Sequence, residues 1–198
     1  MPLHVEFLPE PDARWHGLPV LDVRAEALFE ARLWVGVLRD GKPLFSVTLH
    51  EPPMVEAWRE ACCLEDCILL AGYRHVHVID TCGPARLRCS VPLEGYFSGF
   101  TAPDDIDAPQ DAFTVLVEGC CGVVRFDAAG EVIWANETLA IDGVVLHRLI
   151  DGSLLGEGEW DPPGGWVPFS LDIETGRTLV ESPAIAPPGG LPPPRRAG

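Results

Sequence analysis

The fold is decided by a short pattern that reads GVVRFDAAGEVIW over residues 122–134. Its two apolar runs are rich in β-branched residues, which favour strands. Asp127 and Gly130 lie between the runs. An Asp side chain can hydrogen-bond the backbone of a turn, and Gly adopts a positive φ without strain. The pattern therefore predicts two antiparallel strands joined by a short hairpin.

The same pattern recurs along the chain. It reads LWVGVLRDGKPLFS from residue 33, HVHVIDTCGPARLRC from residue 75 and WVPFSLDIETGRTLV from residue 166. The aspartates of the four units are separated by 40, 47 and 45 residues: Asp40, Asp80, Asp127 and Asp172. Further apolar runs lie before or between the hairpins, at 68–71, 113–117, 144–149 and 153–158. Three to four strands in about 45 residues is the period of a propeller blade.

We therefore expect an all-β, antiparallel, repeat-built fold. Two architectures fit it: a small or incomplete β-propeller-like arrangement, and a twisted open sheet or β-sandwich. A single β-repeat domain is expected over residues 1–182. The stretch 183–198 contains Pro-Pro-Gly-Gly and Pro-Pro-Pro runs, which cannot pair in a sheet. A flexible or polyproline-II tail is expected there.

Helix is expected in two places at most. Over Pro52–Asp66 the apolar residues fall on one helical face, and prolines stand near the first turn. A strand through Ala61–Leu64 is the competing interpretation. Over Val23–Leu33 good helix formers compete with an alternation that suits a strand equally.

The repeat resembles the blade units of WD40-like and quinoprotein-like propellers, in which a strand ending in Asp meets a Thr-Gly or Asp-Gly turn. The resemblance covers about residues 33–180. Three further segments make the chain similar to a group of small, uncharacterised bacterial cytosolic proteins with propeller-like repeats: Tyr96-Phe97, Ile141-Asp142-Gly143-Val144 and Gly158–Trp166. This resemblance implies a β fold and no particular reaction.

Composition limits the function. The 198 residues carry 14 Lys+Arg against 30 Asp+Glu, a net charge of −16. Such an excess of acid repels phosphates and excludes a general nucleic-acid binder. The chain shows no secretory leader in its first ten residues and no apolar run near the ~20 residues that span a bilayer. We expect a soluble, cytoplasmic protein that binds no membrane.

The seven cysteines are odd in number and form no C-x-x-C knuckle. They are expected to be free, buried, small apolar side chains. His75 and His77 would share one face of a strand, but no third metal ligand is identifiable. Neither a metal nor any other cofactor is expected.

Binding residues are expected in two aromatic loops. The segment GEGEWDPPGGW (156–166) places two indoles beside carboxylates around a Pro-Pro-Gly-Gly turn. It suits an anchor for a basic partner, although a long hairpin whose indoles cover its own edge fits as well. The segment GYFSGF (95–100) is either a recognition loop or an aromatic strand of the core. The candidate binding residues are Glu157, Glu159, Trp160, Asp161, Trp166, Tyr96, Phe97 and Asp142.

The sequence contains no G-x-S-x-G, H-E-x-x-H or P-loop motif. The favoured hypothesis is accordingly a non-enzymatic, acidic protein-binding module. A bacterial immunity-type protein that neutralises a basic toxin is one form of it, suggested by charge and size. The alternative is a small hydrolase that uses Glu157, Glu159 or Asp161, with or without a metal at His75 and His77.

Overall fold

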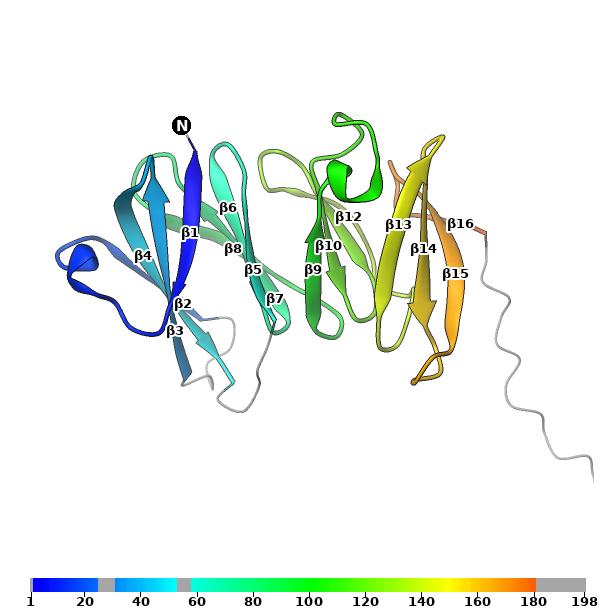
Figure 1. Cartoon of the computed structure of the whole chain (residues 1–198), viewed down its shortest axis with the longest axis horizontal. Coiled ribbons are helices and arrows are strands. Elements are labelled where there is room, and N and C mark those ends of the chain that lie inside the picture. The colour runs from blue at the N-terminus through cyan, green and yellow to red at the C-terminus, as the bar shows by residue number, and fades with distance from the viewer. Residues whose placement is uncertain (1, 25–30, 53–57, 181–198) are drawn as a thin grey trace, which may run out of the picture.

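The computed structural model describes residues 2–24, 31–52 and 58–180. These residues form sixteen strands and two short 3₁₀ turns, η1 (Ala13–Trp15) and η2 (Pro103–Ile106). The strands make four four-stranded sheets, A to D, which lie side by side in chain order along the long axis of the molecule (Figure 1). The all-β prediction is confirmed. The tail expected over 183–198 lies outside the described residues.

Sheet A has the strand order β1 (Leu3–Leu8), β3 (Ala31–Arg39), β4 (Lys42–Glu51), β2 (Val20–Arg24), and β2 is parallel to β4. The other three sheets are antiparallel meanders in chain order. Sheet B contains β5 (Arg59–Cys63), β6 (Cys67–Gly72), β7 (His75–Asp80) and β8 (Arg86–Pro92). Sheet C contains β9 (Phe97–Thr101), β10 (Val115–Gly119), β11 (Val123–Phe126) and β12 (Val132–Asn136). Sheet D contains β13 (Val144–Ile150), β14 (Ser153–Glu159), β15 (Trp166–Asp172) and β16 (Thr178–Val180).

Three apolar layers hold the sheets together. Val35, Val47 and Leu49 of sheet A pack against Ile68 and Ile79 of sheet B. Residues of the opposite face of sheet B, among them Leu69 and Val78, pack against Val117 and Phe126 of sheet C. The third layer joins sheets C and D through Leu116, Val123, Trp134, Leu154 and Leu171. The central strands of sheets B and C are thus buried on both faces, which explains why β6 is apolar without alternation.

Arginines tie each sheet to the next. Arg39 of sheet A donates from Nη2 to the carbonyl oxygen of Thr81, 2.9 Å away, just after β7. Arg88 of sheet B donates to the carbonyl of Ala129 in the β11–β12 turn. Arg125 of sheet C donates from Nη1 to the carbonyl of Ile173, 2.7 Å away, in the β15–β16 turn. Each guanidinium satisfies a turn carbonyl of the following sheet.

The four Asp turns are not all equivalent. The turns at Asp80, Asp127 and Asp172 join the third and fourth strands of sheets B, C and D. Asp40 instead joins β3 and β4, the second and third strands of sheet A, in a two-residue turn where Asp40 and Gly41 have φ of 52° and 73°. The first unit of the repeat is therefore not equivalent to the other three, because β1 and β2 flank its hairpin on either side within sheet A.

The helix predicted over Pro52–Asp66 is wrong where the structure describes it. Arg59–Cys63 forms β5, which pairs antiparallel with β6, so the strand alternative holds. Residues 53–57 and 25–30 lie outside the described residues. The ends of the second candidate, Val23 and Leu33, are strand residues of β2 and β3. In both segments the described residues pair with neighbouring strands of sheets A and B. This pairing outweighs their helix propensity.

Candidate functional site

Sheet D exposes the side that faces away from sheet C. Leu146, Leu154 and Leu171 point toward sheet C, and strand alternation sends their neighbours to the other side. We call this other side the outer face of sheet D; it comprises Val145, His147, Arg148, Ile150, Leu155, Glu157, Glu159, Trp166 and Pro168. The exposed fractions are 41% for Val145, 42% for Ile150 and 41% for Trp166.

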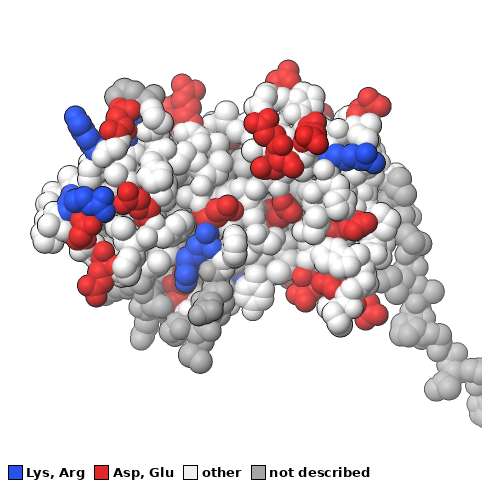
Figure 2. All heavy atoms as spheres, in the orientation of Figure 1, with Lys and Arg blue, Asp and Glu red and all other residues white. Residues whose placement is uncertain are grey.

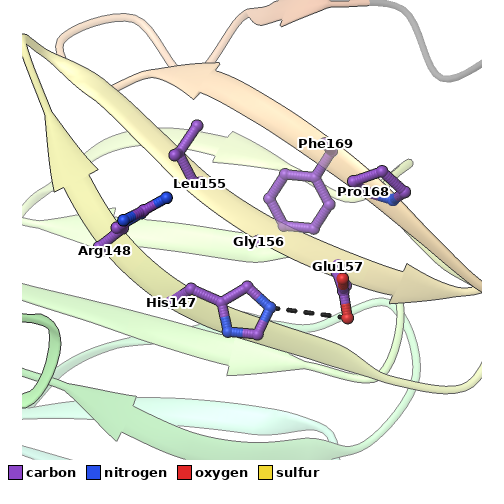
Figure 3. Close-up of a pocket in the computed structure, with 7 residues that line it drawn as sticks. All are labelled: His147, Arg148, Leu155, Gly156, Glu157, Pro168 and Phe169. Carbon is purple, nitrogen blue, oxygen red and sulfur yellow. Dashed lines mark ion pairs between the residues drawn. The ribbon is translucent and has the colours of Figure 1, made fainter.

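A shallow pocket of about 490 Å³ lies on this face. Figure 3 shows its lining, which comes from three adjacent strands: His147, Arg148, Leu155, Gly156, Glu157, Pro168 and Phe169. Nε2 of His147 stands 3.6 Å from Oε2 of Glu157, and both side chains are nearly half exposed. An exposed pair of this kind is worth at most about 1 kcal/mol. The apolar floor and charged rim suit a side chain that carries both an apolar stem and a charge.

The hairpin between β14 and β15 extends the face at one end. Trp166 and Glu159 are register partners. A Cβ on Gly143 would lie 3.1 Å from Cη2 of Trp166, so the indole rests against that glycine. The amide of Gly164 donates to Oε1 of Glu159, and the amide of Ile141 donates to the carbonyl of Glu159. These contacts hold an exposed indole beside a carboxylate.

The structure brings most of the predicted site residues together. Glu157, Glu159 and Trp166 lie on the outer face, Asp161 is exposed in the hairpin, and the amide of Asp142 lies 3.4 Å from the carbonyl oxygen of Glu159. Trp160 is half-buried at the base of the hairpin. Its position fits the alternative in which an indole covers the edge of its own hairpin.

Tyr96 and Phe97 lie elsewhere, at the start of sheet C. The Tyr96 ring is 50% exposed and meets Tyr73 edge-on, with 5.4 Å between ring centroids. Phe97 is 4% exposed and packs against Phe100 in the layer between sheets B and C. The aromatic-strand interpretation thus describes Phe97, and neither residue belongs to the face of sheet D.

Five side chains of the pocket were missed by sequence reasoning: His147, Arg148, Leu155, Pro168 and Phe169. One signal could have found Leu155. In the run SLLGEGE (153–159) Leu155, Glu157 and Glu159 alternate with Gly156 and Gly158, which places them on one face of a strand. His147 could not have been placed in this way, because a bulge between Leu146 and Arg148 breaks the alternation of β13.

The histidines and cysteines build no metal centre within 2–24, 31–52 and 58–180, where no group of three potential ligands is found. His75 and His77 do share a strand face, and their rings stack at 5.9 Å. His77 is buried, with Nδ1 2.8 Å from Oγ of Ser90. Burial raises the pKa of the Cys62 thiol to about 11, with a further contribution from Cys63. A thiol with such a pKa is a poor nucleophile.

Burial, assisted by the neighbouring His75, lowers the pKa of His77 to about 3 from its usual 6.5. The unfolded chain binds a proton near pH 6.5 and the folded chain does not. Above pH 6.5 the His77 ring is neutral in both states and leaves the free energy of unfolding unchanged. As the pH falls from 6.5 toward 3, the unfolded chain gains a proton that the folded chain does not, and the free energy of unfolding decreases. We expect a loss of about 2 kcal/mol between pH 7.5 and pH 5.

Urea unfolding at these two pH values tests the expectation. His77→Gln keeps a polar group near Ser90 and removes the titration. The variant is expected to lack the pH-dependent part of the loss, whatever its stability at pH 7.5. An equal loss in both proteins would show that other groups govern this pH range.

The described chain is a row of four sheets whose last member presents a surface that mixes apolar side chains with charged ones of both signs. No helix in the described part of the chain is long and apolar enough to cross a bilayer. No protein-family model matches the chain, and a comparison with curated proteins finds no match. The site must therefore be interpreted from its own chemistry.

Proposed function

We propose that the protein is a non-enzymatic binding module whose outer face of sheet D receives a basic protein partner. In this proposal the four sheets are the blades of an open, propeller-like arc. Contacts of β1 with β5 and of β5 with β9 support it, because they align the leading strands of sheets A, B and C. A cationic toxin, such as a nuclease, is the kind of partner that an immunity-type role would require.

The observation that carries the proposal is the exposed Trp166 beside Glu159, with Glu157 next along the same face of β14, on a surface that also exposes Val145 and Ile150. Aromatic side chains supply most of the binding energy at interfaces, and a rim of carboxylates selects for Arg or Lys in the partner. The whole surface assists: acidic side chains far outnumber basic ones on the face shown in Figure 2. With a net charge of −16 the chain attracts basic proteins from a distance.

Affinity capture with a matched pair of variants tests the proposal. Glu157→Gln/Glu159→Gln and Glu10→Gln/Glu65→Gln change the net charge equally, but Glu10 and Glu65 are exposed acids away from sheet D. We expect the first pair to reduce capture of basic proteins about ten-fold and the second to leave it nearly unchanged. Trp166→Ala should act like the first pair.

Quantitative mass spectrometry of the captured proteins at physiological salt is the measurement. Equal loss with both pairs would reduce the interaction to general attraction between charges. Capture that is indifferent to all three variants would remove the outer face of sheet D from the proposal.

A further inference from the structure

The outer faces of the two terminal sheets differ. In sheet A the outer face is covered by a segment of the chain itself. Trp15, at the end of η1, is 3% exposed and lies over Gly36 of β3, where a Cβ would be only 2.2 Å from Cζ2 of the indole. Stacked repeats need such a cover at their ends, because an end sheet otherwise leaves an apolar face in water.

At the other end, no described segment covers sheet D. Val145, Ile150 and Trp166 are each more than 40% exposed on its outer face. The pocket there is floored by Leu155 and Pro168. The described chain thus has one covered end and one open end.

The chain continues from the open end. β16 is the edge strand of sheet D, and its last residue, Val180, pairs with Ser170, two positions from Pro168 of the pocket. Eighteen residues follow, 181–198. At about 3.1 Å per residue in an extended proline-rich conformation they can reach about 55 Å. A seven-residue strand is only about 23 Å long, so the segment can reach every part of the outer face.

The chemistry of this segment matches the face. Residues 181–198 read ESPAIAPPGGLPPPRRAG, with six prolines, two larger apolar residues and a pair of adjacent arginines. Proline rings pack well on aromatic and apolar surfaces and lose little entropy when they bind. Arg195 and Arg196 are a basic pair in a strongly acidic chain. Glu157 and Glu159 are the carboxylates that the outer face offers them.

We propose that residues 181–198 bind the outer face of sheet D of their own chain. Leu191 and the prolines around it cover Leu155 and Pro168, and Arg195 and Arg196 pair with Glu157 and Glu159. The segment is then a ligand in cis, and under the proposed function an external partner must displace it. It also defines that partner: an extended, proline-containing segment with adjacent arginines.

Photo-crosslinking in the full chain tests this inference. Benzoylphenylalanine at position 191 is expected to form crosslinks within one chain, to peptides that contain 145–168. Arg195→Glu/Arg196→Glu should lower their yield about five-fold, as expected for two exposed ion pairs. Adding Glu157→Arg/Glu159→Arg should restore the yield, because the charges are exchanged.

Three results would overturn the inference: crosslinks to sheets A to C, a yield indifferent to charge reversal, or crosslinks only between chains that vanish on dilution. The last would assign the face to a second copy. Partner capture separates this inference from the proposed function. Arg195→Glu/Arg196→Glu should increase capture of basic proteins if the segment competes for the face. Crosslinks without capture would reject the proposed function alone, and capture through Glu157 and Glu159 without crosslinks would reject the inference alone.

Discussion

Trp134→Ala is expected to lower the free energy of unfolding by about 3–5 kcal/mol. Trp134 lies on β12 of sheet C but packs on the β15–β16 turn of sheet D. A Cβ on Gly176 would lie 2.5 Å from the indole, and Nε1 of Trp134 donates to the carbonyl of Ile173 over 2.7 Å. The variant removes a large buried ring and one of the two hydrogen bonds to the carbonyl of Ile173, the other being donated by Arg125.

The neighbouring residue provides the control. Ile133 is 48% exposed on the opposite face of β12, and Ile133→Ala should change the free energy of unfolding by less than about 1 kcal/mol. Urea unfolding followed by circular dichroism measures both. Because the sheets are stacked in a row, Trp134→Ala is further expected to broaden the transition as sheet D separates first. Equal effects of the two substitutions would contradict the placement of Trp134 between sheets.

Gly158→Ala is the second substitution with a large expected effect. An ideal Cβ at this position of β14 would lie 2.0 Å from the carbonyl oxygen of Leu139 and 3.1 Å from Cβ of Ala140. The first contact is with backbone, so it cannot be relieved by a side-chain rotation. We expect a loss of at least about 2 kcal/mol. The hairpin that carries Trp166 should shift as well, which would weaken partner capture.

Gly99→Ala is the matched control, because Gly99 of β9 has no atom within 4 Å of an added Cβ. The alanine variant should be as stable as the original protein within about 0.5 kcal/mol. Thermal unfolding of the two variants side by side is sufficient. Equal unfolding temperatures for Gly158→Ala and Gly99→Ala would contradict this expectation, because they would show that the backbone at Leu139 moves aside at little cost.

Local chemistry made much of this fold predictable. Asp127 accepts hydrogen bonds from the amides of Ala129 and Glu131, and Asp172 accepts from the amide and hydroxyl of Thr175. These are the Asp turns that the repeat predicts. Asp80 occupies the same position in its turn, but its carboxylate forms ion pairs with Arg86 and Arg88. The guanidiniums hold the pKa of Asp80 below its usual range.

The first sheet was the least predictable part. The run LHVEFL (3–8) does alternate, and it forms β1, but no Asp–Gly turn precedes or follows it. β2 pairs in parallel with β4, a long-range contact that leaves no local signal. Strand β5 was predicted as a helix because periodicity alone separates short helices and strands poorly.

Of the candidate site, the sequence predicts the β14–β15 hairpin but not the pocket beside it. The hairpin with Trp160 and Trp166 stands out by composition, whereas the pocket beside it is built by pairing between β13, β14 and β15. Which side of β14 faces water depends on sheet C covering the other side. That information belongs to the packing of two repeats and is absent from either repeat alone.

The arginines that join the sheets all act in one direction, from A to B, from B to C and from C to D. The row of sheets is therefore directional: each of sheets A, B and C supplies the arginine, and the sheet after it supplies the carbonyl. A further four-stranded sheet after sheet D could be joined in the same way if sheet D carried an arginine that reached a carbonyl in the third turn of the new sheet. Extending the row would require such an arginine in addition to an apolar layer like the three that join the existing sheets.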